Sequence, residues 1–247
     1  MYLRIFIFLA AVLLLPVKNA AAQQLSLSAG VFSVQSEYRG SDARVLPMPV
    51  VRYEGERFFI RNTEAGVWLW NDGTQKFSIG ATLLPQYFRS SKSDDQAMKQ
   101  LDNRNIIVLG TLGYELNTDF GSLKLSASGD ITGTSDGFLL NAAYIYPITF
   151  GALTIMPNGG LLYSSSNFNE YYYGISHGEA RRSGLAAYSP DGSLTPFVGV
   201  SANYAVTSHW SLFASWKVIF LSDEIKDSPM VDRSAQNILG GGLTYTF

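Results

Sequence analysis

The chain ends with the segment Gln236–Phe247, QNILGGGLTYTF, and this stretch decides the fold. Taken in steps of two back from the last residue, one face carries Phe247, Tyr245, Leu243, Gly241 and Leu239. The opposite face carries threonine and glycine. Because successive side chains of a β-strand point to opposite faces, the alternation predicts a strand that has one apolar side and reaches the last residue.

The same alternation recurs along the chain in runs of ten to fourteen residues. In residues 121–132, for example, the apolar positions Leu123, Leu125, Ala127 and Ile131 alternate with serine, lysine, aspartate and threonine. Strands of a soluble sandwich usually span about five or six residues, whereas crossing a bilayer at a tilt takes about nine to eleven. The length of the runs therefore predicts an all-β protein, a transmembrane antiparallel β-barrel.

About twelve strands are expected, and their connections are unequal in length. The expected strands are residues 25–37, 44–54, 56–62, 64–71, 75–89, 104–117, 120–132, 137–148, 151–164, 194–206, 209–221 and 236–247. An even number places both termini on one side, where the joints are tight, while longer connections lie on the other. This asymmetry is typical of short periplasmic turns and long extracellular loops. Residues 56–71 could instead be one bent strand, which would change the count.

The N-terminal residues 1–22 have the features of a secretory signal peptide. A lone Arg4 precedes an apolar run, and the run ends at Pro16 and Lys18 before the small residues 20–22. The run is too short for a membrane anchor, which needs about twenty apolar residues. We therefore expect residues 23–247 to form the barrel domain. This domain contains more acidic than basic residues, which gives no basic surface for nucleic acid.

The expected interior of the barrel is polar but carries few charges. Eight strands leave an interior that side chains fill, and sixteen to eighteen leave a channel, so twelve strands fall between these cases. The main charges expected to face inward are Lys76, Arg104, Glu115, Lys124, Asp130 and Lys217, and the candidate residues of the lumen are Lys76, Lys124, Asp130 and Lys217. Both a narrow water path and a plugged interior are compatible with this set.

The sequence offers no convincing catalytic, metal or cofactor site. It contains two histidines, His177 and His209, and no cysteine. Ser176, His177, Glu179 and Ser183 lie together in one loop, but a catalytic triad is recognised by geometry and not by proximity in sequence. We expect a protein that is not an enzyme and that binds no cofactor.

Two clusters in the longest loop are candidates for surface recognition. Tyr171, Tyr172 and Tyr173 form an aromatic run, and Arg181 and Arg182 a basic pair. Aromatic girdles at the membrane interface are the commoner use of such tyrosines, and exposed rings also serve binding sites. The arginines could form charge-assisted pairs with phosphates of outer-membrane lipids and lipopolysaccharide, or remain solvated.

Several stretches are similar to the MipA/OmpV family of outer-membrane proteins. They are Ser36 to Asp42 (SEYRGSD), Arg44 to Pro47 (RVLP), Tyr172 to Ser176 (YYGIS), Arg182 to Leu185 (RSGL) and Asp227 to Val231 (DSPMV). The last strand also resembles the closing strand of outer-membrane barrels. This likeness implies that Leu243, Tyr245 and Phe247 form a signal for the barrel assembly machinery.

The resemblance implies a barrel in the outer membrane of a Gram-negative bacterium. Its family function would be a scaffold that joins a lytic transglycosylase to a peptidoglycan synthase. Other members are described as porin-like proteins or adhesins, so a small-solute pore and a surface adhesin remain alternative hypotheses. Against the scaffold, the expected periplasmic face has only tight turns, whereas a standard interface uses about 800 Å² per partner.

Overall fold

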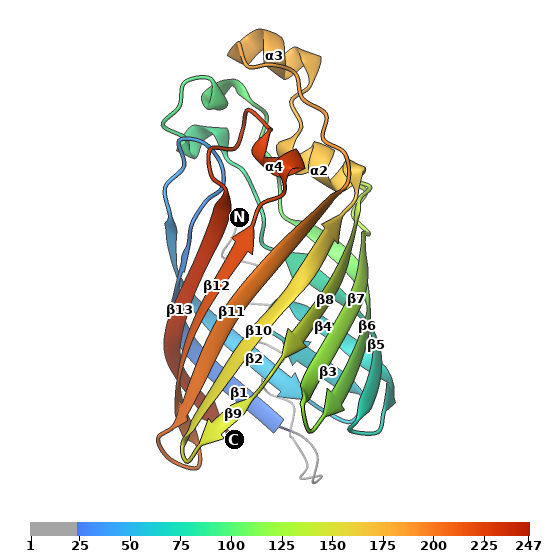
Figure 1. Ribbon diagram of the computed structural model, residues 1–247, viewed down its shortest axis with the longest axis vertical. Helices are drawn as coiled ribbons and strands as arrows, with labels where there is room; N and C mark the ends of the chain where they lie inside the picture. Colours follow the sequence, from blue (N-terminus) through green and yellow to red (C-terminus); the bar gives the residue numbers. More distant parts are fainter. Residues whose placement is uncertain (1–23) are drawn as a thin grey trace.

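The computed structural model describes residues 24–247, and these form an antiparallel barrel (Figure 1). The predicted signal peptide, residues 1–22, lies outside the described residues. The strands are β1 (Gln24–Val34), β2 (Arg44–Glu54), β3 (Phe58–Arg61), β4 (Glu64–Asn71), β5 (Gln75–Leu84), β6 (Ile107–Thr118), β7 (Gly121–Asp130), β8 (Phe138–Ile145), β9 (Ile148–Phe150), β10 (Leu153–Ser164), β11 (Ser193–Ala205), β12 (Trp210–Phe220) and β13 (Ala235–Thr246).

The last strand closes the barrel. β13 pairs with β12 on one side and with β1 on the other, and β10 pairs with β11, so the order of strands returns to its start. Across the β1–β13 seam, Ser26 lies opposite Thr246 and Ser28 opposite Thr244. Their hydroxyl oxygens lie 3.0 and 2.7 Å apart. Closure satisfies the edges that lipid would otherwise leave without partners.

Thirteen strands occupy twelve positions in the wall. β8 and β9 both pair with β10, at Asn158–Ser164 and at Leu153–Ile155 respectively. They are separated by Tyr146 and Pro147, and proline has no N–H to give to a ladder. The expected strand 137–148 is therefore a longer, interrupted strand, and the predicted count of twelve is confirmed.

The uncertain region, residues 56–71, contains two strands. β3 has only four residues, shorter than the expected 56–62, whereas β4 has the expected bounds. They are joined by the turn Asn62–Thr63, where Asn62 adopts a left-handed φ of 57°. β3 reaches β2 only at residues Arg52 to Glu54, so this hairpin accompanies β2 for a small part of its length.

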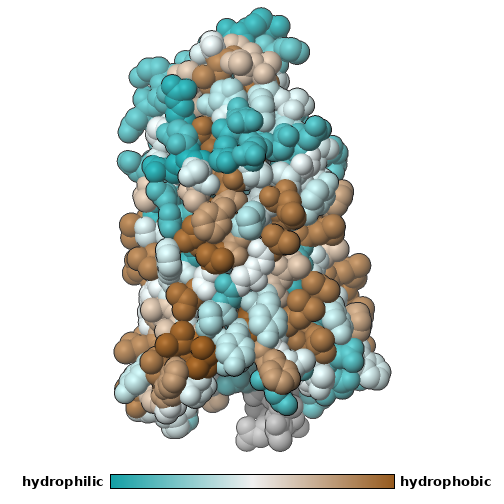
Figure 2. All heavy atoms as spheres, in the orientation of Figure 1, coloured by the Kyte–Doolittle hydropathy of each residue, from teal (hydrophilic) through white to brown (hydrophobic). Residues whose placement is uncertain are grey.

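The outer surface of the wall is apolar. Figure 2 shows apolar side chains over the strands and hydrophilic ones gathered at the end that carries the helices. The large exposed apolar side chains include Val31, Ile79, Leu112, Leu125, Leu140, Leu161, Leu212 and Leu239. These are the outward positions of the alternating runs, as expected of a wall in contact with lipid.

The long connections fold into a cap across the extracellular end of the barrel (Figure 1). They contain the 3-10 helices η2 (Ser90–Lys92) and η3 (Met98–Gln100), and the α-helices α2 (Ser166–Tyr173), α3 (His177–Ser183) and α4 (Asp223–Lys226). In the described part of the chain, no helix is long and apolar enough to span a membrane. The buried apolar cluster beneath these helices comprises Tyr38, Phe88, Met98, Leu101, Ile107, Leu109, Leu139, Phe168, Tyr172, Tyr173, Ile175, Leu221, Ile225, Met230 and Val231.

Candidate functional site

The three tyrosines of the predicted recognition patch do not form an exposed surface. Tyr172 and Tyr173 are 0% and 5% exposed, so the expectation that they are accessible is wrong. They end α2, whose N-cap Ser165 accepts a hydrogen bond from the N–H of Phe168, and the helix directs both rings into the cap cluster. Tyr171 is only partly buried and its hydroxyl accepts a hydrogen bond from the N–H of Asn105 at 2.7 Å. These rings hold the cap together.

A buried carboxyl, Glu37, lies where the cap meets β13. Its Oε1 accepts a hydrogen bond from the Tyr173 hydroxyl at 3.3 Å, and its Oε2 accepts one from Gln236 Nε2 at 2.8 Å. Gln86 Nε2 donates to the same tyrosine hydroxyl at 2.8 Å. Burial raises the pKa of Glu37 above its ordinary value, despite these hydrogen bonds and the charge of Arg44.

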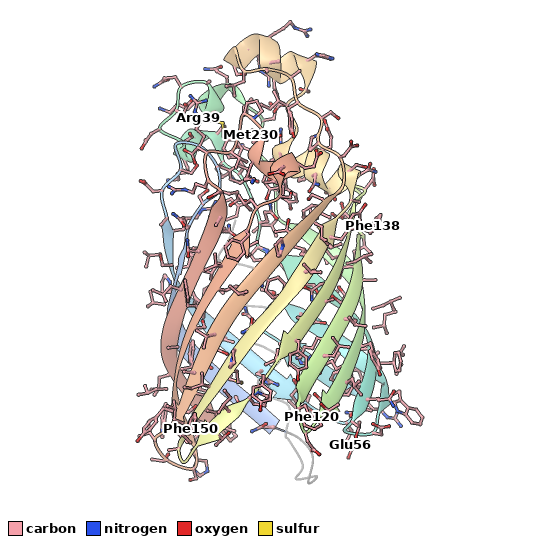
Figure 3. All side chains as sticks on the ribbon, in the orientation of Figure 1. Arg39, Glu56, Phe120, Phe138, Phe150 and Met230 are labelled. Atoms are coloured by element: carbon pink, nitrogen blue, oxygen red, sulfur yellow. The ribbon has the colours of Figure 1, made fainter. Side chains whose placement is uncertain are left out.

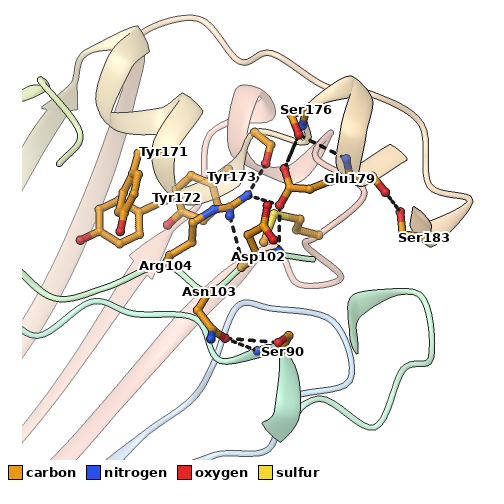
Figure 4. A network of polar contacts seen from close by, with 12 residues as sticks. Ser90, Asp102, Asn103, Arg104, Tyr171, Tyr172, Tyr173, Ser176, Glu179 and Ser183 are labelled. Atoms are coloured by element: carbon orange, nitrogen blue, oxygen red, sulfur yellow. Dashed lines mark hydrogen bonds and ion pairs between the residues drawn. The ribbon is translucent and has the colours of Figure 1, made fainter. Parts of the chain in front are cut away.

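An ion pair inside the cap joins the loop before β6 to α3 (Figure 4). Arg104 Nη2 lies 2.9 Å from Glu179 Oε1, and both side chains are nearly inaccessible. The N–H groups of Asp102 and Ser176 donate to the same carboxylate at 3.0 Å each. Burial opposes ionisation of Glu179, but these N–H groups and the Arg104 guanidinium outweigh it and hold its pKa below the ordinary value.

The serine, histidine and glutamate cluster of the long loop is a helix cap. Ser176 and Glu179 form a capping box at the start of α3, in which each side chain binds the other residue's backbone N–H. Ser183 Oγ donates to the carbonyl of Glu179 at 2.8 Å. The Ser176 hydroxyl also donates to Glu179 Oε2 at 2.9 Å. The polar atoms of Ser176, Glu179 and Ser183 are thus engaged in fixing the helix.

The two arginines of the same loop are exposed on α3, beyond the strand ends (Figure 1). Arg182 Nη2 lies 2.9 Å from Asp102 Oδ1, in a pair whose side chains are 48% and 68% exposed. Arg181 is likewise exposed. Both lie at the tip of the cap, above the apolar wall that contacts lipid.

Inside the barrel, charged side chains gather near the turn after β2. Arg61 Nε lies 2.6 Å from Glu54 Oε1, and Arg61 also pairs with Glu115. Lys124 Nζ lies 3.7 Å from Glu115 Oε1 on the neighbouring strand. The sequence analysis placed Lys124 and Glu115 inside but missed Arg61 and Glu54. Their inward positions follow from alternation, but only pairing of β2 with β3 brings them together. The sequence analysis was wrong about Arg104, which lies in the cap.

The other predicted lumen residues are dispersed. Lys76 Nζ lies 5.2 Å from the ring centroid of Trp68, and Lys217 Nζ lies 3.9 Å from that of Phe197. Asp130 ends β7, and its carboxylate accepts hydrogen bonds from the backbone N–H groups of residues 132, 134, 135 and 136 of the following loop. Asp130 thus organises an extracellular loop, and the structure does not bring it together with the charged group around Arg61.

The end opposite the cap is a ring of short turns, which we call the periplasmic rim: residues 55–57, 72–74, 119–120, 151–152 and 206–209. Several aromatic side chains are exposed at or beside it, among them Phe120 at 77% and Phe150 at 63%. Figure 3 shows both at the end away from Arg39 and Met230. The sequence analysis did not single out these two phenylalanines, although each lies in or beside a predicted turn.

The C-terminal residues named as an assembly signal lie on the outer face of β13. The rings of Tyr245 and Phe247 meet edge to face with centroids 4.8 Å apart, and Trp210 packs on Tyr245 at the same distance. Leu243 lies opposite Ala29 of β1 and Leu212 of β12. The backbone N–H of Phe247 donates to the carbonyl of Leu25 at 3.1 Å, so the last residue is held to β1.

Comparison with known proteins finds relatives that cover nearly the whole chain. The MltA-interacting protein of Escherichia coli (strain K12) is 40% identical over 227 residues, which cover 92% of each chain. The putative outer membrane protein YiaT of the same strain is 35% identical over 93% of each chain. Among solved structures, a NanC porin is similar over 90% of this chain and 98% of its own, with 11% identity and a TM-score of 0.47.

The family model described as MltA-interacting protein MipA matches residues 27–247, which is nearly all of the described barrel. Relatives that cover most of the chain are named outer membrane proteins, and the apolar wall fits that location. The resemblance noted in the sequence is confirmed: the chain belongs to the MltA-interacting protein MipA family and is a twelve-stranded β-barrel of the Gram-negative outer membrane.

Proposed function

We propose that this barrel docks a lytic transglycosylase of the cell wall at its periplasmic rim. The observation that carries the proposal is the 40% identity, over 92% of both chains, to a protein named for its interaction with MltA. A peptidoglycan synthase joined to the same assembly is the second partner that the family resemblance implies. An enzyme of the wall is reached only from the periplasm, so the rim is the surface that it would contact.

The rim offers rigid apolar contacts. Phe120 stands at the tip of the β6–β7 turn, where Gly121 adopts a φ of 123° that other residues rarely take. Thr118 Oγ1 donates to the carbonyl of Gly121 at 2.9 Å, and the Tyr144 hydroxyl donates to the carbonyl of Phe120. A turn that is already ordered loses little conformational entropy on binding.

Aromatic side chains at the rim could instead serve the membrane interface, where Trp and Tyr are enriched. Phe120 is the most exposed of the large apolar side chains of the described residues, at 77%, and it lies in the turn beyond the strands. Aromatic residues dominate the energetic centres of protein interfaces. We therefore assign Phe120 and Phe150 as the central contacts of the docking surface.

The two alternatives receive less support from the structure. A pore along the barrel axis would open at the extracellular end, but the apolar cluster of the cap lies across that end. An adhesin acting through Tyr172 and Tyr173 would need exposed rings, and both are buried. Neither observation affects the periplasmic rim.

The test is capture of a purified lytic transglycosylase by the mature barrel held in detergent micelles. Phe120→Ala with Phe150→Ala should weaken binding by roughly five- to thirtyfold, the loss typical of interface residues worth 1–2 kcal/mol. Phe138→Ala is the matched control, because Phe138 is an exposed phenylalanine at the opposite end of the wall (Figure 3). Equal binding by all variants would contradict the proposal. The two phenylalanines would then be assigned to the membrane interface.

A further inference from the structure

The wall of the barrel is interrupted beside β2. Residues 44–54 of β2 pair with β1 along their whole length, but β3 covers only Arg52 to Glu54 on the other side. The tip of the β3–β4 hairpin ends there, with the N–H of Asn62 donating to the carbonyl of Val51 at 2.9 Å. Above that bond, residues 45–50 of β2 have no neighbouring strand on this side among the described residues.

The next strand round the wall borders the same gap. The N–H of Leu83 on β5 donates to the carbonyl of Thr63 at 2.8 Å, which is the last backbone contact between β5 and the hairpin. Beyond it the chain continues through residues 84–87. At the upper end, Arg44 Nη2 donates to the carbonyl of Tyr87 at 3.3 Å, and its guanidinium lies 3.9 Å from the centroid of that tyrosine ring. These contacts close the gap at its two ends.

Prolines line this gap on both sides. The carbonyl of Val51 points toward β3, and alternate residues of a strand point the same way, so Pro47 and Pro49 also face the gap. Neither has an N–H, and Pro85 on the opposite side, the next position but one after Leu83, lacks one as well. Without these donors the middle of the edge cannot form a regular ladder with another strand, which argues against a peptide or a second barrel as the occupant.

The carbonyls of the open edge are left without a partner. In the described part of the chain, no hydrogen bond is found for the carbonyls of Pro47 and Pro49 on the side away from β1. Pro49 lies opposite Ala29, the central residue of β1, so the open edge falls within the part of the wall that spans the membrane. An open sheet edge is not tolerated in lipid unless it lines a water-filled space, so the edge requires water from the lumen.

The side chains around the gap are apolar on its outer side and lie above an ionic group on its inner side. On its outer side, Val45 is 66% and Val31 53% exposed at the apolar surface. On its inner side, the inward positions of β2 are Leu46, Met48 and Val50, all partly buried. Below them, under the tip of the hairpin, lies the ionic group of Arg61 with Glu54 and Glu115. Apolar side chains with charged groups below them suit a molecule with one apolar and one polar end.

We propose that the gap between β2 and β5 is a lateral portal through which amphipathic small molecules exchange between the outer membrane and the barrel lumen. The cap folds across the extracellular end of the barrel (Figure 1), and the portal opens below it, in the plane of the membrane. This inference does not rest on the docking role of the rim, which is at the other end of the same wall.

Access of water is the first measurement, made on the mature barrel in phospholipid vesicles. The chain has no native cysteine, so Pro49→Cys and Leu243→Cys each provide a single thiol. The two positions are matched, because both face outward and both lie opposite Ala29. A charged, membrane-impermeant methanethiosulfonate should modify the Pro49→Cys variant faster by roughly tenfold or more. Val45→Cys and Leu239→Cys, both opposite Ser33, repeat the comparison with no proline removed.

Binding of an amphiphile is the second measurement, with dansylaminoundecanoic acid as the fluorescent probe. Val50→Arg places a charge on the inner side of the portal. Thr244→Arg places one at a matched register position of the closed wall, since both positions lie opposite Ser28. Val50→Arg should weaken probe binding by roughly tenfold and Thr244→Arg should not, with folding of both checked by heat-modifiable migration. Equal thiol reactivity at the matched positions, or equal effects of the two arginines, would overturn the portal.

Discussion

Arg104 and Glu179, which are 75 residues apart in sequence, form a buried ion pair with Nη2 2.9 Å from Oε1. Arg104 precedes β6 and Glu179 lies in the first turn of α3. Arg104 also donates to the carbonyls of Asp102 and Gly174, each at 3.0 Å. One guanidinium thus connects two long extracellular connections, and the cap depends on it.

Replacing Arg104 by methionine should loosen the cap while the barrel stays folded. The change leaves the Glu179 carboxylate buried without its counter-charge, and breaking a buried pair in this way costs about 3–5 kcal/mol. Hydrogen exchange of the α3 amides should therefore accelerate by roughly a hundredfold or more, with little change in the amides of β12 and β13.

Arg182→Met provides the control, because Arg182 lies in α3 like Glu179 and forms an exposed pair with Asp102 of the loop before β6. Exposed pairs contribute about 0–1 kcal/mol, so α3 should exchange nearly as in the unmodified protein. Similar exchange in the Arg104 and Arg182 variants would show that the buried pair does not hold the cap.

Glu37 should make closure of the cap depend on pH. Its pKa in the closed cap is raised above the ordinary 4.5 by burial, so the closed state binds the proton more tightly than the open state. Closure is then most favourable below the ordinary pKa and weakens as the pH rises through the raised value. Amides around Tyr173 should exchange faster at pH 8 than at pH 5, after correction for intrinsic rates. Each unit by which burial raises the pKa changes the closure equilibrium, and with it the exchange rate, by up to about tenfold.

Two variants separate this effect from others. Glu37→Gln is neutral like the protonated acid and should remove the difference between pH 5 and pH 8. Glu179 has a lowered pKa, so its contribution is present above pH 4.5 and is lost only as the pH falls further. Glu179→Gln should weaken the cap equally at pH 5 and pH 8. A pH dependence that persists in Glu37→Gln would assign it to another group.

The strands could be predicted from the sequence because apolar residues recur at every second position along each of them. The segment around Leu243 was recognised as a closing strand, and its pairing with β1 at Ala29 is the pairing a closed barrel requires. The apolar residues expected on the outer face, such as Leu125 and Leu212, are the exposed ones. Local alternation is sufficient for these features, since lipid imposes the same rule on every strand.

The cap could not be derived in the same way. Tyr173 meets Glu37 across 136 residues of sequence, and Tyr38 donates to the carbonyl of Tyr172 across 134. Contacts between loops have no periodic signature, so the tyrosines resembled exposed interface residues. The gap beside β2 was missed for a related reason: the strand carrying Pro47 and Pro49 was recognised, but its missing neighbour follows from the shortness of β3.

Gly240→Ala should destabilise the barrel through a clash in its interior. A Cβ at this position would meet three ring atoms of Phe32, which lies directly opposite on β1. Overfilling a packed site costs about 1–3 kcal/mol. Urea unfolding in micelles should show this loss, and Phe32→Ala in the same chain should relieve the clash, giving a non-additive cycle.

Gly129→Ala is the control for that experiment, because a Cβ at Gly129 meets nothing within 4 Å. It should change the unfolding free energy by no more than about 0.5 kcal/mol. A loss as large at Gly129 as at Gly240 would indicate a general effect of glycine in strands and not a contact with Phe32.

Phe247→Ala should impair assembly in cells far more than it impairs stability. The side chain is 66% exposed and packs on Tyr245, a contact worth about 0.5–1.5 kcal/mol, while the backbone bond from Phe247 to Leu25 is unaffected by the substitution. Urea unfolding of the refolded barrel should therefore change little. If the last residues are read by the barrel assembly machinery, the amount of folded protein in the outer membrane should fall severalfold.

Phe150→Ala is the control, because it removes a phenylalanine of similar exposure at the same end. This variant should leave the amount of folded protein unchanged. Equal losses for the two variants would show that Phe247 has no special part in assembly.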